Sequence, residues 1–165
     1  MCIRDRSSEN LIDTNRVYAV GYSNGGMMSY ALACYKSNLI SAIGSVSGYM
    51  LQTECTPSHS IPLIKFHGTT DYYDGGGVYN SVDSVLNFWV NFNNTDLDPI
   101  INNIDDNGTS IVSYKYKNGD NNVSVEHYKI IGGEHVWFNN DFNGKNTGQL
   151  IWDFLSQYDI NGLIE

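Results

Sequence analysis

The apolar and polar residues of this chain follow two periods, one typical of strands and one typical of helices. Three short apolar runs are bounded by turn residues and contain β-branched, aromatic or small side chains. We interpret these runs as buried strands, which cover 17–20, 40–47 and 62–68.

Three other stretches place apolar residues three and four positions apart, which is the spacing of one helical face. The predicted helices begin after Gly25, near Val82 and near Thr147. Their predicted inner faces consist of Met28, Ala31, Leu32 and Tyr35; of Val82, Val85, Leu86, Trp89 and Val90; and of Ile151, Phe154, Leu155 and Tyr158.

The region between the last two helices predicts a loop and a hairpin. Residues 93–108 are polar and rich in turn residues, so we expect a surface loop there. Residues 110–117 and 123–131 alternate in polarity, and Asn118-Gly119 between them supports a β-hairpin. Strands that alternate with helices indicate an α/β fold with a mostly parallel sheet, to which this hairpin is added.

The motif Gly-Tyr-Ser-Asn-Gly at 21–25 lies between the first predicted strand and the first predicted helix. This context predicts a nucleophile elbow, in which Ser23 occupies a strained turn with its hydroxyl exposed. Gly21 and Gly25 would let strand and helix approach without a clash between side chains. The backbone N–H of Asn24 would face the oxyanion that forms during acyl transfer.

A serine hydroxyl becomes a strong nucleophile only when a base accepts its proton, and four histidines are candidates. His135 follows two glycines at the end of the last predicted strand, where a loop can bring its Nε2 to the serine, so we favour it. His59 lies in a polar loop, His67 at a strand end suits a structural hydrogen bond, and His127 lies within a hairpin strand.

Two aspartates follow the third predicted strand and could orient that histidine. Asp71 is nearer the strand and therefore better fixed than Asp74, so we favour Asp71. Functional groups of a doubly wound sheet gather at the carboxyl ends of its strands. The chain order Ser23, Asp71, His135 is also the order of the triad in α/β-hydrolases.

Composition and charge exclude several other classes of function. Nine basic and eighteen acidic residues give a net charge of −9, which argues against nucleic acid or an anionic membrane surface as a partner. The Asn- and Asp-rich stretch 102–109 lacks the bidentate glutamate of a calcium loop, so we expect a solvated turn. We expect no metal and no cofactor.

Two of the three cysteines lie where they could pair. Cys34 falls at the end of the first predicted helix and Cys55 in the loop after the second predicted strand. We favour a short disulfide over the alternative of two buried thiols. A disulfide would place the protein outside the reducing cytosol.

The motifs together resemble the secreted polyhydroxybutyrate depolymerase and feruloyl esterase group of α/β-hydrolases. The resemblance rests on the elbow, on the cysteine segments, on Phe-His-Gly-Thr-Thr-Asp at 66–71 and on Gly-Glu-His-Val-Trp at 133–137. It implies a secreted serine esterase with the same three triad residues and a Cys34–Cys55 disulfide. Trp137 and Tyr22 would lie on the substrate side, although plain packing is an equal alternative for Trp137.

Two departures from that family pattern concern the substrate cleft and the start of the chain. Tyr-Tyr-Asp-Gly at 72–75 replaces the usual turn after the acid. Family members carry earlier strands whose His-Gly loop donates a second oxyanion N–H, and no such strands precede Asp13. We therefore expect a partial, C-terminal hydrolase domain at 13–160 with an exposed edge at 17–20, and a non-native or disordered stub at 1–12 without a signal peptide.

The sequence thus predicts serine ester hydrolysis on polysaccharide-linked, phenolic or polyester substrates, by a protein that is monomeric when complete. The part present here is expected to be poorly soluble and weakly active, because an edge strand is exposed and one oxyanion donor is missing. Two alternatives remain open, a serine peptidase of the same fold and a non-catalytic protein that binds carbohydrate or a surface.

Overall fold

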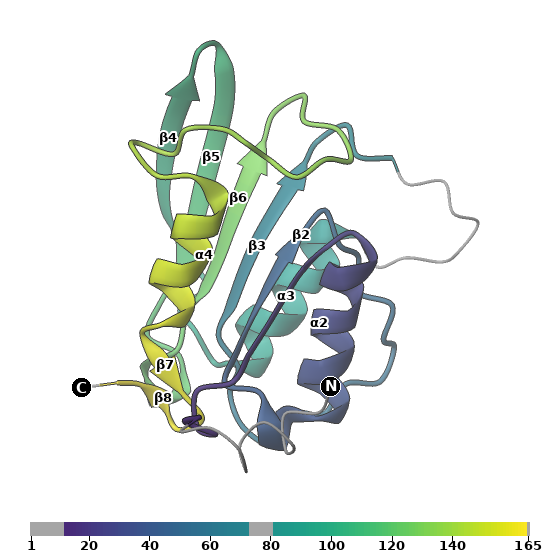
Figure 1. Cartoon of the computed structure of the whole chain (residues 1–165), viewed down its shortest axis with the longest axis vertical. Coiled ribbons are helices and arrows are strands. Elements are labelled where there is room, and N and C mark those ends of the chain that lie inside the picture. Colours follow the sequence, from purple (N-terminus) through teal and green to yellow (C-terminus); the bar gives the residue numbers. More distant parts are fainter. Residues whose placement is uncertain (1–11, 73–80, 165) are drawn as a thin grey trace.

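A six-stranded sheet forms the centre of the computed structural model, which describes residues 12–72 and 81–164 (Figure 1). Most of the predicted stub and the alternative acid Asp74 lie outside these residues. The strand order is β1-β2-β3-β6-β5-β4, in which the first four strands are parallel and the last two pairings are antiparallel. The strands are β1 Tyr18–Tyr22, β2 Ala42–Val46, β3 Leu63–Gly68, β4 Ile100–Asp106, β5 Thr109–Tyr116 and β6 Val125–Ile130. A mostly parallel sheet with an added antiparallel part is the fold class that the sequence predicted.

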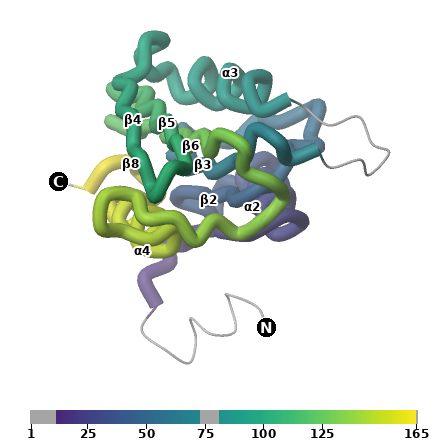
Figure 2. The backbone as a smooth tube through the Cα atoms, turned by 90° about the horizontal axis from the view of Figure 1, so that it is seen from above, coloured from purple at the N-terminus to yellow at the C-terminus, as the bar shows by residue number. Residues whose placement is uncertain are grey.

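Helices cover both faces of this sheet. Helices α2 (Asn24–Tyr35) and α3 (Val82–Phe92) pack on one face, and α4 (Thr147–Leu155) packs on the other. The view along the sheet shows α3 and α4 on opposite sides of the strands (Figure 2). The remaining elements are short: the 3-10 helices η1 Ser37–Leu39 and η2 Asp120–Asn122, and the strand pair β7 Tyr158–Asp159 and β8 Gly162–Leu163. None of the helices within 12–72 and 81–164 combines the length and apolar character needed to cross a membrane.

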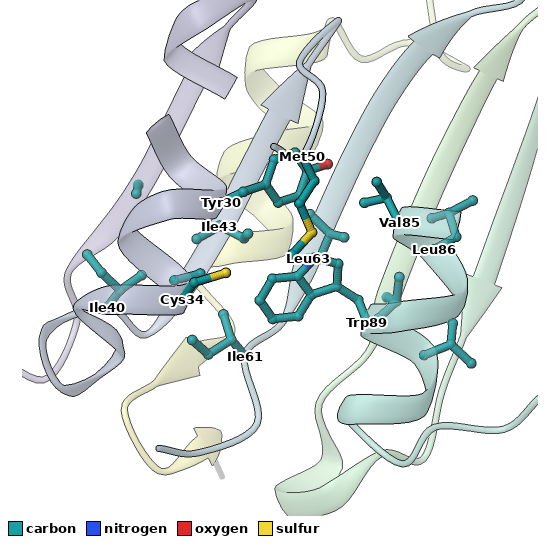
Figure 3. Packing of buried hydrophobic residues seen from close by; sticks show 14 residues of the cluster. Tyr30, Cys34, Ile40, Ile43, Met50, Ile61, Leu63, Val85, Leu86 and Trp89 are labelled. Atoms are coloured by element: carbon teal, nitrogen blue, oxygen red, sulfur yellow. The ribbon is translucent and has the colours of Figure 1, made fainter. Parts of the chain in front are cut away.

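The two central strands are buried along their whole length, which explains their compact apolar sequences. Every residue of β2 and β3 is buried, because helices cover both faces of the parallel sheet. On the face of α2 and α3, the indole of Trp89 points towards Leu63 and Tyr30 (Figure 3). The rings of Trp89 and Tyr30 stack with centroids 6.4 Å apart, which joins the two helices over the sheet.

The buried face of α2 differs from the predicted one. Met28 and Tyr35 are 59% and 61% exposed, whereas Tyr30 and Ala33 are fully buried. The helix is apolar on most of its surface, so residue spacing alone does not select its inner face. The turn at the start of the helix selects it, because Gly26 is pressed against the loop after β2 and Tyr30 and Ala33 follow four and seven positions later.

The predicted surface loop at 93–108 contains a strand. Residues 100–106 form β4, which pairs with β5 across a two-residue turn at Asn107-Gly108. Both turn residues have positive φ, 51° and 89°, as expected for an Asn-Gly hairpin. The prediction was wrong because β4 is an edge strand with mostly exposed residues, so it lacks the alternation of a half-buried strand.

The strand β1 forms the other edge of the described sheet. In residues 12–72 and 81–164 it pairs with β2 alone, and Val20 is 43% exposed. An exposed apolar edge at this strand agrees with the sequence-based expectation.

A disulfide joins Cys34 at the end of α2 to Cys55 in the loop between β2 and β3, as predicted. The Cα atoms are 4.7 Å apart and the two residues are 21 positions apart. The bond ties the helix that begins at the elbow to a loop without regular secondary structure.

Replacement of Cys34 and Cys55 by serine is expected to lower the free energy of unfolding by about 3 kcal/mol, because a loop of this length is no longer closed in the unfolded chain. Urea unfolding without reductant measures the effect. The control repeats the titration with reductant, in which the double variant and the unaltered chain should unfold alike, and equal stability of the double variant without reductant would contradict the prediction.

His127 on β6 is buried without charge. Its side chain is 4% exposed and stacks on Tyr114, with ring centroids 5.8 Å apart. Burial, with Lys65 and Lys129 adding repulsion, lowers the pKa of His127 to about 3. Between about pH 6.5 and pH 3, His127 is therefore protonated in the unfolded chain but neutral in the folded chain. Folding then costs the loss of this proton, so stability decreases as the pH falls below about 6.5.

Substitution His127→Phe keeps the ring and removes this titration. The slope of unfolding free energy against pH between pH 6 and pH 4 should then decrease by about 1.4 kcal/mol per pH unit. Urea titrations at several pH values measure it, with His59→Gln at a half-exposed histidine as the control that should change the slope less. An unchanged slope in folded His127→Phe would show that this histidine is not held neutral.

Candidate active site

Ser23 occupies the junction between β1 and α2 in a strained conformation. Its φ of 53° and ψ of −117° lie outside the regions that L-residues prefer, and its N–H donates to the carbonyl of Val46 at 2.9 Å. Asn24 is the first residue of α2, so its N–H belongs to the first turn, whose N–H groups have no partner within the helix. The predicted elbow geometry is therefore present.

Of the two glycines predicted to allow close approach at the elbow, the structure confirms Gly21 and not Gly25. A Cβ at Gly21 would lie 2.2 Å from the carbonyl carbon of Gly25, so position 21 requires glycine. A Cβ at Gly25 would meet nothing within 4 Å, so the expected clash at that position was wrong. The second constrained position is Gly26, where a Cβ would lie 2.6 Å from Ser45 Oγ.

Ser23, His135 and Asp71 form a hydrogen-bonded chain. His135 Nε2 lies 2.8 Å from Ser23 Oγ, and His135 Nδ1 lies 3.0 and 3.2 Å from the two carboxylate oxygens of Asp71. A carboxylate can only accept, so we assign the imidazole proton to Nδ1, and Nε2 accepts from the serine hydroxyl. The Asp71 side chain is fully buried, and that of His135 is 28% exposed.

The acid and the histidine lie in the loops that follow two neighbouring parallel strands. Asp71 follows β3 and His135 follows β6, and Figure 1 shows the loops after both strands at the same edge of the sheet as the start of α2. The two loops are joined at Thr70, whose N–H and hydroxyl donate to Gly133 O at 2.9 and 2.8 Å. The contact fixes both loops relative to each other.

Two further side chains contact Asp71 besides His135. Tyr49 donates its hydroxyl to Asp71 O at 2.6 Å, and His67 Nε2 lies 3.4 Å from Asp71 Oδ2. Burial, with Lys65, His127 and His135 adding repulsion, lowers the pKa of His67 to about 2, so this imidazole is neutral. The structural role predicted for His67 is compatible with these contacts. Tyr49 had no signal in the sequence, because its contact is made across the fold.

Tyr22 contacts the histidine loop directly. Its hydroxyl donates to His135 O at 2.8 Å, and its ring lies 5.4 Å from the imidazole. A second anchor comes from Ser47, whose hydroxyl donates to Val136 O at 3.0 Å. Trp137, two residues beyond His135, is 38% exposed. The structure therefore places Tyr22 against the backbone and ring of His135 and leaves Trp137 partly exposed two residues further on.

A cavity of about 420 Å³ lies on the Asp71 side of the site. Its described lining includes Tyr49, His67, Asp71 and Tyr72, but neither Ser23 nor His135. The cavity therefore adjoins Asp71 and does not include the nucleophile in its lining. In the described part of the chain, no three histidine, cysteine, aspartate or glutamate side chains are grouped as metal ligands.

Comparison with known proteins gives the family. Residues 3–99, more than half of the chain, match the Phospholipase/Carboxylesterase family. The chain is 29% identical over 162 residues to the bifunctional acetylxylan esterase/xylanase XynS20E of Neocallimastix patriciarum, covering 97% of the chain and 23% of that protein. It is 27% identical over 176 residues to feruloyl esterase B of Piromyces equi, covering 96% of the chain and 30% of that protein.

A solved structure shares the fold. The acetyl xylan esterase from Aspergillus awamori superposes with a TM-score of 0.56 at 12% identity, covering 90% of this chain and 62% of that one. The chain spans about a quarter to a third of the length of the two curated relatives. It belongs to the phospholipase/carboxylesterase family of the α/β-hydrolases, and feruloyl and acetylxylan esterases are among its relatives.

Proposed function

We propose that the chain carries the catalytic centre of a serine carboxylic-ester hydrolase. The observation that supports this most strongly is the chain of hydrogen bonds from Ser23 Oγ through His135 to the buried carboxylate of Asp71. Serine, histidine and aspartate in this geometry perform acyl transfer in several unrelated folds.

In the proposed reaction, Ser23 Oγ attacks the ester carbonyl carbon while its proton moves to His135 Nε2. The N–H of Asn24 stabilises the oxyanion, and Asp71 orients and stabilises the imidazolium. Collapse of the intermediate breaks the bond to the alkoxide, which takes the proton from Nε2 and leaves an acyl-enzyme. Water then attacks the acyl carbon, giving its proton to Nε2. The second collapse returns that proton to Ser23 Oγ and releases the carboxylic acid.

The proposed substrates are acetyl or feruloyl esters of plant polysaccharides. The names of the two curated relatives, an acetylxylan esterase and a feruloyl esterase, support this class. A polyester of the polyhydroxybutyrate type is the other candidate from the sequence motifs. Trp137, exposed beside the histidine loop, is the residue that we propose on the substrate side.

We also propose that the protein works outside the reducing cytosol. The Cys34–Cys55 disulfide supports an oxidising compartment, because such bonds persist in secreted proteins and are rare in the cytosol of mesophiles. The peptidase and the non-catalytic binding protein remain the rival hypotheses, and measurements of turnover decide between them.

The nucleophile is tested with a fluorophosphonate probe, read by intact mass. One adduct is expected on the full chain and none on Ser23→Ala, with Ser110→Ala at an exposed serine as the control that keeps the adduct. Turnover of acetyl, feruloyl and hydroxybutyrate esters should decrease by at least about 1,000-fold in Ser23→Ala. No adduct on a protein with native circular dichroism would contradict the proposal, and turnover of a peptide but of no ester would favour the peptidase.

The loop anchor at Tyr22 gives a second prediction. Tyr22→Phe keeps the ring against the imidazole but loses the 2.8 Å hydrogen bond to His135 O, so the loop should hold Nε2 less accurately. The rate of fluorophosphonate labelling is expected to decrease by about tenfold. Tyr35→Phe, at an exposed tyrosine at the end of α2, should label at the rate of the unaltered chain. Equal rates for both variants would show that this hydrogen bond does not position the histidine.

A further inference from the structure

Lys65 is a charged side chain in the middle of the sheet. It lies on β3, is 1% exposed, and is the one buried lysine or arginine in the described part of the chain. Lysine is almost never fully buried unless its charge is paired. Its Nζ donates to Gly48 O at 2.8 Å and to His67 Nδ1 at 3.2 Å, and lies 5.7 Å from the centre of the Tyr30 ring. The ammonium is therefore contacted by the loop after β2, by a neighbouring side chain on β3 and by an aromatic ring of α2.

The contact with Lys65 fixes the tautomer of His67. An ammonium can only donate, so Nδ1 of the neutral imidazole must accept and the ring proton lies on Nε2. That nitrogen lies 3.4 Å from Asp71 Oδ2. Lys65, His67 and Asp71 thus form one polar chain, which continues through His135 to Ser23.

The other titratable groups around this chain leave Lys65 as the buried counter-charge of Asp71. On β6, His127 is neutral and Lys129 is half-exposed. On the two helices of this face, burial raises the pKa of Tyr30, which stays neutral, and Asp83 is exposed. Tyr49 contacts Asp71 as an uncharged donor. Burial lowers the pKa of Lys65 to about 7, against the opposing pull of Asp71. Below pH 7 the ammonium is present.

We propose that Lys65 is a positioning residue of the proposed hydrolase, and that through His67 its charge compensates the buried carboxylate of Asp71. The inference rests on the proposed function. Lys65 thereby sets the pH at which the His135–Asp71 pair takes up the proton that inactivates the base. The two groups share one buried network, so the protonation belongs to the pair rather than to either residue.

The sign of the effect follows from charge. Uptake of a proton adds positive charge to the pair, and the Lys65 ammonium opposes it. Removal of that ammonium makes uptake easier, so the inactive, protonated form should persist to higher pH. Two charges on either side of one imidazole ring, at an effective dielectric constant of about 20, predict a displacement of roughly one pH unit.

The experiment compares the full chain with Lys65→Met and Lys65→Gln. Methionine keeps the packing without the charge, and glutamine also keeps a hydrogen-bond donor. Two readouts are recorded from pH 4 to pH 9: the imidazole resonances of His135 by NMR, assigned with His135→Gln, and the rate of fluorophosphonate labelling. The control is Lys129→Met, which removes an equal charge from a half-exposed site where water screens it.

The expected result is a titration midpoint of His135 and an acid limb of labelling that both move up by roughly one pH unit in the two Lys65 variants. Lys129→Met should leave both in place. His67→Gln keeps the Lys65 charge and offers it an acceptor, so this variant should lie closer to the unaltered chain than Lys65→Met does.

Unchanged midpoints in a folded Lys65 variant would overturn the proposal, as would an equal displacement in Lys129→Met. The two hypotheses fail separately. If the probe labels neither the unaltered chain nor any variant, the proposed function fails. The NMR midpoint of His135 still decides in that case whether Lys65 acts on His135 and Asp71.

Discussion

The contact between Gly21 and Gly25 is the constraint on which the rest of the structure depends. A Cβ at position 21 would lie inside the backbone of residue 25, so strand and helix meet more closely than any other residue would allow. Ser23 lies between these two glycines with a positive φ, and Gly26 beside them is packed against Ser45 and Gly48. Close approach, backbone strain and burial thus come together at the start of α2.

The remaining parts of the site are arranged around that fixed point. Parallel pairing of β3 with β6 brings the loops that follow them to one edge of the sheet, where Thr70 and Gly133 join them. Tyr22 then holds the backbone of His135 from the elbow itself. The imidazole is therefore positioned by contacts on the rigid sheet, which is how an active site avoids the cost of ordering its groups during the reaction.

The buried charges are the costly part of this arrangement. Lys65 and Asp71 both lie out of water, and an ammonium and a carboxylate lose hydration energy that their mutual attraction recovers only with good hydrogen bonds. His67 lies between them: as a neutral imidazole it accepts from Lys65 at Nδ1, and its Nε2 lies 3.4 Å from Asp71 Oδ2. An apolar residue at position 65 would fill the same space at lower cost, so the proposed role of Lys65 accounts for a charge that packing does not require.

The sequence by itself determined the strand–turn–helix context of Ser23, the order of Ser23, Asp71 and His135, and the alternation of most strands and helices. These features are local, since they follow from residue type and spacing. Tertiary structure alone decided which face of α2 is buried, because an evenly apolar helix has no preferred face. It also decided that 100–106 pairs as an edge strand, that Tyr22 and Tyr49 reach the triad, and that Lys65 contacts His67 beside it. Each of these depends on a partner far away in the chain, and residue spacing carries no information about such partners.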